Sequence, residues 1–371
     1  MKKPVVVLGA NGYTGRLVLE FLTEYGIPFV AAGRSASRIE EVTRTIPGIE
    51  AADYEVVEVA VEREPLIALF RGALVVCNTV GPFFKLAAPV VEAALENGCH
   101  YIDSAGEQPW LLRAKAAYGE HFQAAGRVLA PSTAALYTTA DIAVNLAREL
   151  VPGADSVDVV NYLNGTPTTA STQSIFDLLR SPAYRLLDNQ LVEWDPTQVY
   201  SVVSPADTEV IPAAPWGGTS LPAWYVDDPE IRNVKALTGW MARGLVPTVV
   251  EISKSVLEQA EGKDEAEVIA FLEETATGIQ SGTPQRENPR INRYCDSATV
   301  RGNLRAAQVA VFGHSAYRQS GLYMATATSL LLGGRFMRTG FTSPCATFGH
   351  RTLLAAQEEA GLLRPCTIFA G

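Results

Sequence analysis

The amino-acid sequence predicts an α/β protein in which a doubly wound parallel sheet is joined to a second, α+β domain. Three features support this prediction. Short β-branched runs alternate with amphipathic segments up to about residue 132, a glycine-rich turn follows the first run, and the pattern becomes irregular after Leu150. The chain has 371 residues, and at roughly 150 residues per domain this length suits two domains.

Strands and helices are expected to alternate through the first third of the chain. The expected strands are short and apolar, and they cover residues 5–8, 29–32, 55–61, 74–78, 100–103 and 128–130. The expected helices are amphipathic, and they cover residues 13–25, 37–45, 65–70, 87–97 and 110–125. Such alternation is typical of crossover units, which make the strands parallel and place helices on both faces of the sheet.

The second domain is expected to be less regular. Its expected elements are a helix at 140–150, strands at 157–163, 297–300 and 307–313, and helices at 321–332 and 345–360. Four tryptophans, Trp194, Trp216, Trp224 and Trp240, also lie in this part of the chain. Large aromatic side chains usually serve packing, so we expect them to fill a second core or a dimer contact, with a ligand pocket as the alternative.

Composition excludes several classes of protein. Thirty basic and forty acidic residues give a net charge of −10, which argues against a nucleic acid or an anionic membrane as partner. The scattered cysteines and histidines form no metal-ligand or disulfide pattern, so no metal site is expected. No apolar stretch is long enough for a signal peptide or a membrane span, so we expect a cytoplasmic protein that acts on a small molecule.

A glycine-rich turn directly follows the first expected strand and opens the first helix. It reads Gly9-Ala10-Asn11-Gly12-Tyr13-Thr14-Gly15. Glycines let a pyrophosphate approach the backbone at a helix N-terminus, where free N–H groups and the helix dipole favour negative charge. A tight turn without a ligand is the alternative, but a strand before and a helix after are the context of a dinucleotide-binding, Rossmann-type domain. We therefore expect these residues to bind a dinucleotide cofactor.

The end of the second expected strand indicates which dinucleotide this is. Proteins that bind NAD place an acid about 20 residues beyond the glycines, where it accepts the ribose 2′-hydroxyl. Here Gly33 is followed by Arg34 and Ser35. A guanidinium pairs with a 2′-phosphate, and Arg38 in the next helix adds a second cation. The sequence thus favours NADP (NADPH) over NAD, with a solvated surface arginine as the alternative.

Three motifs occur in order at the ends of successive expected strands. They are Gly9–Gly15 with Gly33-Arg34-Ser35, then Asn78-Thr79-Val80-Gly81-Pro82-Phe83, then Gly98-Cys99-His100-Tyr101-Ile102-Asp103-Ser104-Ala105-Gly106-Glu107. Together they resemble the saccharopine dehydrogenase-like oxidoreductases, a family that includes trans-acting enoyl reductases. The resemblance covers roughly residues 1–132 and returns at Gly340-Phe341-Thr342-Ser343-Pro344. It implies a nicotinamide-nucleotide domain, a second domain with a mixed sheet, and a final helix that packs back on the first domain.

The residues themselves agree with this resemblance, because ligands of open parallel sheets bind outside the carboxyl ends of the strands. We therefore predict that the cofactor is also bound by Asn78, Thr79, Val80, Gly81, Pro82, Phe83, Asp103 and Gly106. For Asp103 and Glu107, capping of the following helix is the alternative. The predicted domains are an NADP-binding domain at 1–135, completed by 341–371, and a substrate-binding and dimerisation domain at 136–340 of a homodimer.

Hydride transfer also requires a proton donor. Tyr137 is the first candidate, because it lies just beyond the sixth expected strand and precedes Thr138 and Thr139, which could cap the next helix. His314 and Tyr317 are the other candidates. A packing role is the alternative for Tyr137. Relatives often carry Gly-Phe-Asp-Ser-x-Pro-Ser-Asp here, of which only Asp141 remains.

The sequence therefore predicts an NADPH-dependent reductase that transfers a hydride to a C=C, C=N or C=O bond of a small or medium-sized, partly apolar metabolite. The Tyr-x-x-x-Lys pair of short-chain reductases is absent, because no lysine has a tyrosine four residues before it. The alternative is a non-catalytic NADP(H)-binding sensor or regulatory protein, since the same fold serves many functions.

Overall fold

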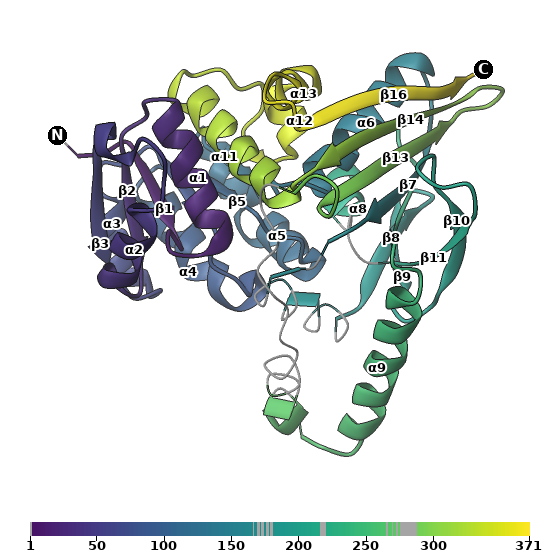
Figure 1. Ribbon diagram of the computed structural model, residues 1–371, viewed down its shortest axis with the longest axis horizontal. Coiled ribbons are helices and arrows are strands. Elements are labelled where there is room, and N and C mark those ends of the chain that lie inside the picture. The colour runs from purple at the N-terminus through teal and green to yellow at the C-terminus, as the bar shows by residue number, and fades with distance from the viewer. Residues whose placement is uncertain are drawn as a thin grey trace. The chain divides into compact units, whose positions relative to one another are not determined.

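The chain forms two compact units, seen in a computed structural model. It describes residues 2–165, 167–168, 171, 174–175, 178, 181–215, 220–264, 266–268, 270–271, 274 and 288–371. The first unit comprises residues 1–105, 110–138 and 317–362, and the second comprises 106–109, 139–316 and 363–371 (Figure 1). Trp216, one of the tryptophans considered above, lies outside the described residues.

The first unit is built on a seven-stranded parallel sheet. Its strands, in spatial order, are β15 (Gly340–Phe341), β6 (Val128–Ala130), β5 (His100–Asp103), β4 (Val75–Asn78), β1 (Val5–Leu8), β2 (Phe29–Gly33) and β3 (Tyr54–Glu58). Val5 lies opposite both Phe29 and Val75, so the order of connection reverses on the two sides of β1. In such sheets the ligand site lies outside the carboxyl ends of the strands at this reversal.

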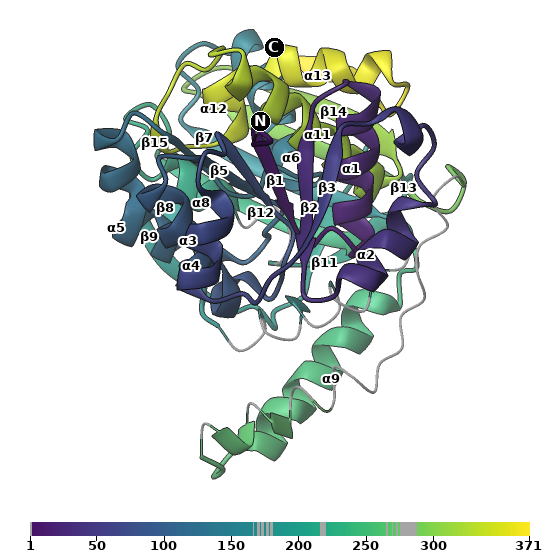
Figure 2. The same cartoon turned by 90° about the vertical axis from the view of Figure 1, so that its left-hand side faces the viewer.

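Helices cover both faces of this sheet, as the alternating sequence pattern predicted. The helices that the pattern predicted are α1 (Tyr13–Glu24), α2 (Ala36–Thr43), α3 (Arg63–Phe70), α4 (Phe83–Glu96) and α5 (Gln108–Ala124). The unit also contains α11 (Ala316–Leu332), α12 (Pro344–Phe348), α13 (His350–Glu359) and a short 3-10 helix at Ile49–Ala51. Figure 2 shows the strands of the sheet with α1 and α2 on one side and α3 and α4 on the other. The predicted Rossmann-type architecture is confirmed.

The second unit contains a mixed sheet, as predicted for an α+β domain. Its strands run in the order β10 (Tyr200–Val203), β11 (Val210–Ala214), β12 (Asn233–Trp240), β7 (Ser156–Leu163), β13 (Arg293–Arg301), β14 (Ala306–His314) and β16 (Leu363–Ala370), and β8 (Ala183–Leu187) and β9 (Gln190–Trp194) form a hairpin on β12. Only β12 and β7 are parallel neighbours along this order. The helices are α6 (Tyr137–Leu150), α8 (Ser220–Tyr225) and α9 (Leu245–Ala260). Trp194 and Trp240 are buried, and Trp194 packs against Ala213 and Leu237 in a core.

The last part of the chain differs from the predicted division at residue 341. Helix α11 belongs to the first unit, because Gly321 brings it close to α1: a Cβ at Gly321 would lie 2.8 Å from the backbone carbon of Leu17. The predicted single helix at 345–360 is interrupted at Gly349, which has φ 83°. Residues 363–370 form strand β16, which pairs antiparallel with β14 in the second sheet instead of completing the nucleotide unit. Strand β16 lies at the edge of the sheet, where a proline such as Pro365 is tolerated.

No helix within the described part of the chain is both long enough and apolar enough to span a bilayer.

Candidate functional site

The glycine turn between β1 and α1 forms a backbone cradle. The amides of Gly9 and Ala10 both donate to the carbonyl of Ala32 at 2.9 and 3.1 Å, which fixes the turn against β2. A Cβ at Gly15 would lie 2.2 Å from the carbonyl oxygen of Gly9, so only glycine fits this position. Gly12 is the N-cap of α1 and makes no side-chain capping bond. The turn therefore has the shape and the helix N-terminus that bind a pyrophosphate, and the predicted residues fit a dinucleotide.

The predicted 2′-phosphate residues lie together at the end of β2. Arg34 and Arg38 are exposed. Ser35 is the N-cap of α2, and its hydroxyl accepts the amide of Arg38 at 3.5 Å. An acid that the sequence analysis did not single out lies here as well: Glu58 ends β3 directly opposite Gly33, and its Oε2 accepts the amide of Ala36 at 2.9 Å. The expected strand at 55–61 has Glu58 in its middle, whereas β3 ends at Glu58.

The loop after β4 is tied to the glycine turn. The hydroxyl of Thr79 donates to the carbonyls of Leu8 and Gly9, at 2.9 and 3.2 Å. Val80 and Gly81 are half-buried, and Phe83 is buried at the start of α4. Pro82 is the N-cap of α4, and the bond between Gly81 and Pro82 is cis. These residues thus lie at the carboxyl end of β4, as predicted.

Asn78 has an internal role. Its side chain is fully buried, its Oδ1 accepts the amide of Val80 at 3.0 Å, and its Nδ2 donates to the hydroxyl of Tyr101 at 2.9 Å. These contacts connect the β4 loop to β5, and the cofactor-binding role of Asn78 stays a prediction. Tyr101, which the sequence analysis quoted only as part of a motif, receives this bond because it is buried in β5.

Asp103 is the centre of this buried polar network. Its Oδ1 accepts the amides of Ala105 and Ser132 at 2.9 and 2.8 Å, and its Oδ2 accepts the hydroxyl of Tyr101 and the indole N–H of Trp110, both at 2.9 Å. Burial raises the pKa of the Asp103 carboxyl, and the four donors counteract that increase. The carboxyl is fully buried, and it organises the loops after β5 and β6 from within. Cofactor binding at Asp103 stays a prediction. We call these residues the Asp103 network: Asn78, Tyr101, Asp103, Trp110 and Ser132. The network links the carboxyl ends of β4, β5 and β6.

The turn between β6 and α6 contains two residues with unusual backbone. Ser132 has φ 61° and Leu136 has φ 72°, and positive φ at a leucine is a strained conformation that clusters at functional sites. Tyr137 follows Leu136 as the first residue of α6 and is half-buried. The predicted cap, Thr138, instead closes the turn: its hydroxyl donates to the carbonyl of Ser132 at 3.0 Å and accepts the amide of Ala134 at 3.2 Å. This geometry holds Tyr137 at the carboxyl end of β6.

The other two proton-donor candidates belong to different units. Tyr317, at the start of α11, lies in the first unit, where its ring meets Tyr13 of the glycine turn edge-on with centroids 5.2 Å apart. Arg16 covers the Tyr13 ring at 5.4 Å. His314 ends β14 in the second unit, and its Nδ1 is 3.1 Å from the hydroxyl of Ser315. Tyr317 is thus close to the cofactor turn, whereas sequence reasoning had placed it in the other domain.

The segment that contains Gly106 is held by the second unit. Gly106 is half-buried. Gln108 donates to and accepts from the backbone of Tyr184, at 2.9 and 2.7 Å, and Glu107 accepts the hydroxyl of Ser174 at 3.1 Å. Residues 106–109 therefore belong with the second unit, although they directly follow β5.

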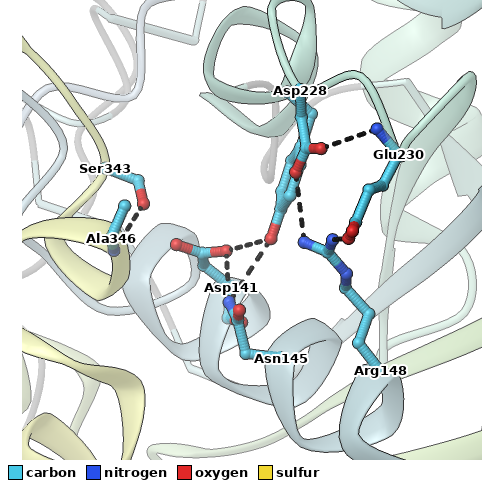
Figure 3. A network of polar contacts seen from close by, with 8 residues as sticks. Asp141, Asn145, Arg148, Asp228, Glu230, Ser343 and Ala346 are labelled. Carbon is cyan, nitrogen blue, oxygen red and sulfur yellow. Dashed lines mark hydrogen bonds and ion pairs between the residues drawn. The ribbon is translucent and has the colours of Figure 1, made fainter. Parts of the chain in front are cut away.

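Asp141, the remainder of the family motif, lies in a polar network of the second unit (Figure 3). Its Oδ1 accepts the hydroxyl of Tyr225 at 2.6 Å and the amide of Asn145 at 3.0 Å. Arg148, about two turns beyond Asp141 along α6, pairs with Asp228 and Glu230 at 3.2 and 2.7 Å. These bonds tie α6 to α8 and the turn after it, which is a structural role.

The C-terminal motif also has a structural explanation. Ser343 is the N-cap of α12, and its hydroxyl accepts the amide of Ala346 at 3.1 Å (Figure 3). Among the described residues, no group of three or more histidine, cysteine, aspartate or glutamate side chains is arranged to hold a metal ion.

Two family models match the chain, and together they cover most of it. The model of the saccharopine dehydrogenase NADP binding domain matches residues 5–129, and the model of a family of unknown function, DUF5938, matches residues 138–369. The first match confirms the resemblance drawn from the motifs.

Curated relatives match parts of the chain. It is 32% identical over 153 residues to the lipid droplet localized protein of Caenorhabditis elegans, which is 39% of this chain and 36% of that protein. It is 36% identical over 107 residues to the trans-acting enoyl reductase of Mycobacterium tuberculosis, which is 28% of this chain and 25% of that protein. The chain therefore matches about a third or less of the length of these relatives.

A solved structure matches the whole chain. Saccharopine dehydrogenase (L-Glu forming) from Saccharomyces cerevisiae aligns with a TM-score of 0.63 at 13% identity, over 99% of this chain and 100% of that one. At this identity the likeness shows a shared fold.

Proposed function

The chain belongs to the family of unknown function DUF5938 and carries a saccharopine dehydrogenase NADP binding domain, and on this premise we propose that it is an NADPH-dependent reductase. It transfers a hydride to a C=C, C=N or C=O bond of a small or medium-sized, partly apolar metabolite. The observation that carries this proposal is the backbone cradle of Gly9–Gly15, where a Cβ at Gly15 would lie 2.2 Å from the carbonyl oxygen of Gly9. When bound, the reduced dinucleotide supplies the hydride.

The residues of the chain have distinct parts in this function. The amides at the N-terminus of α1 bind the pyrophosphate, and Arg34 with Arg38 attracts the 2′-phosphate because both are exposed at the end of β2. Tyr137 donates the proton that must accompany the hydride. The name of the mycobacterial relative, an enoyl reductase, supports a C=C bond among the three classes.

Cofactor preference is tested by fluorescence titration with NADPH and NADH. We expect NADPH to bind more tightly, and Arg34→Ala to reduce the difference by about tenfold or more, because a charge-assisted contact contributes about 1.5–3 kcal/mol. Arg44→Ala, which removes an exposed arginine at the other end of α2, is the matched control and should leave both affinities unchanged. Equal affinities of the wild type for the two cofactors would contradict the assignment to NADPH.

Catalysis is tested by substrate-dependent oxidation of bound NADPH. The probes are an α,β-unsaturated thioester, a 2-oxo acid with an amine, and an apolar ketone, one for each class of bond. Oxidation with one probe class supports the reductase and identifies the bond. Tight NADPH binding without oxidation by any probe favours the sensor or regulatory protein.

The proton donor is tested on the probe that reacts. Tyr137→Phe removes one hydroxyl and little volume, so kcat should fall by about 10²-fold or more while NADPH affinity stays nearly constant. Tyr317→Phe and His314→Gln are the comparison variants. Full activity of Tyr137→Phe with a loss in one of the other two would move the role to that residue.

The predicted homodimer stays a proposal, and light scattering of the purified chain tests it. Trp194 and Trp240 are buried within a single chain, so these two tryptophans no longer argue for a dimer contact.

A further inference from the structure

The residues around the end of β2 contain one acid among the predicted cations. Glu58 ends β3, and in the parallel register it lies directly opposite Gly33, the residue before Arg34. The adjoining amide of Val59 donates to the carbonyl of Gly33 at 2.9 Å, so the two strand ends are fixed to each other. Glu58 is therefore next to the residues that decide between a 2′-phosphate and a 2′-hydroxyl.

The Glu58 carboxylate also accepts a hydrogen bond from a backbone amide that would otherwise be available to a bound anion. Its Oε2 accepts the amide of Ala36, the first residue of α2, at 2.9 Å. The other donors at this helix end are partly occupied too, because Ser35 accepts the amide of Arg38 and lies 3.1 Å from the hydroxyl of Ser37. The helix end thus already holds one negative charge, supplied by the protein.

We propose that Glu58 is a specificity-determining residue that weakens the binding of NADPH relative to NADH. This inference rests on the proposed function, because it concerns the same cofactor site. Two effects act in the same direction. The carboxylate repels a 2′-phosphate, and it accepts the hydrogen bond from the Ala36 amide that the phosphate would otherwise accept. Towards NADH the same carboxylate is an acceptor for a ribose hydroxyl, as acids at the end of the second strand are in NAD-binding proteins.

Arg34 and Glu58 therefore oppose each other. Arg34 is exposed, and among the described residues it forms no ion pair with Glu58 that would neutralise either charge. The cofactor preference of this chain is then a balance of two residues from adjacent strand ends, and it can be shifted from either side.

The test is the ratio of the dissociation constants for NADH and NADPH, measured by calorimetry on the full chain. Glu58→Gln removes the charge and keeps an oxygen that can accept the Ala36 amide, so the fold is retained. We expect the ratio to rise by about tenfold, since a like charge a few ångströms away costs about 1–2 kcal/mol near a surface. Glu55→Gln is the matched control: it removes the same charge from an exposed position of β3 three residues earlier, and the ratio should not change.

A second probe isolates the adenosine end of the cofactor. Adenosine 2′,5′-bisphosphate should bind more tightly to Glu58→Gln than to the wild type, whereas adenosine 5′-monophosphate should not. An unchanged or lower ratio, with unchanged affinity for the bisphosphate, would overturn the role of Glu58 and leave the reductase proposal intact. If the wild type bound neither dinucleotide, the proposed function itself would fail.

Discussion

Asp103 and Asp296 are both fully buried aspartates on strands, but the donors around them differ. Asp103 lies at the end of β5, and its two oxygens accept four hydrogen bonds from Tyr101, Ala105, Trp110 and Ser132. Asp296 lies in the middle of β13, where Oδ1 accepts the amide of Asn161 at 2.7 Å and Oδ2 has no hydrogen-bond partner among the described residues. Burial raises the pKa of Asp296 to about 8, and the single bond from Asn161 only partly counteracts it.

This difference shows when a buried carboxyl can organise a structure. A buried carboxyl group is tolerated where donors surround it, and each donor group is then held in place. At Asp103 the donors come from several segments, so the carboxyl fixes the loops after β5 and β6. At Asp296 the strands are already held by their own ladder, and the acid is protonated at neutral pH. An aspartate therefore organises loops in the first unit, whereas in the second unit it lowers stability.

The largest expected effect concerns the pH dependence that Asp296 confers. Its folded-state pKa of about 8 lies above the value of about 4 for an unfolded aspartate, so folding takes up a proton between these values. Stability should therefore fall as the pH rises through this window, by up to about 1.4 kcal/mol per pH unit and roughly 4 kcal/mol between about pH 5 and 8. Asp296→Asn keeps the acceptor for Asn161 and should remove this dependence. Urea denaturation across the pH range measures it.

The control for Asp296→Asn is Glu41→Gln, which neutralises an exposed acid on α2 and should leave the pH profile of the wild type in place. If Asp296→Asn and the wild type lost stability equally between pH 5 and 8, Asp296 would be ionised in the folded state, and the contrast with Asp103 would disappear.

The same substitution at Asp103 should lower the stability of the fold. Asp103→Asn replaces one acceptor oxygen by an amide group, so two buried donors lose their partner, and stability should fall by about 3 kcal/mol. Thermal and urea unfolding followed by circular dichroism measure this loss. Asp195→Asn is the matched control, because Asp195 is exposed and its Asn variant retains the acceptor for the Thr197 amide. Wild-type stability in Asp103→Asn would mean that the four observed bonds do not hold the loops.

The smallest effect comes from removing a single donor. Tyr101→Phe deletes the hydroxyl that donates to Asp103 and accepts from Asn78, and we expect a loss of about 1.5 kcal/mol. Tyr54→Phe deletes a hydroxyl from a half-buried ring that stacks on Phe29 and should cost less than about 0.5 kcal/mol. A double-mutant cycle of Tyr101→Phe with Asp103→Asn should give a coupling of about 1 kcal/mol. Strict additivity would show that the two residues act independently.

Much of the first unit could be predicted from the sequence, because its signals are local. The spacing of apolar runs predicted the strands and helices. The glycines at positions 9, 12 and 15 predicted the turn between β1 and α1, because backbone sterics require glycine there. The positions of Arg34 and of the Asn78–Phe83 loop followed from strand ends in the same way. Errors occurred at boundaries: β3 ends at Glu58, three residues before the predicted end at 61, so the position of this acid next to the end of β2 was not predicted.

The remaining features were decided by contacts between segments far apart in the chain. Helix α11 lies on α1 because Gly321 meets the backbone of Leu17, and β16 joins the second sheet because β14 offers it an edge. Asp103 and Asp296 look alike in the sequence, since each is a single aspartate shortly after an aromatic residue. Their different roles depend on how many donors the tertiary structure brings within 3 Å of each carboxyl, four in one case and one in the other. Local sequence determines which groups a segment carries, whereas hydrogen-bond partners and charge states depend on the folded surroundings.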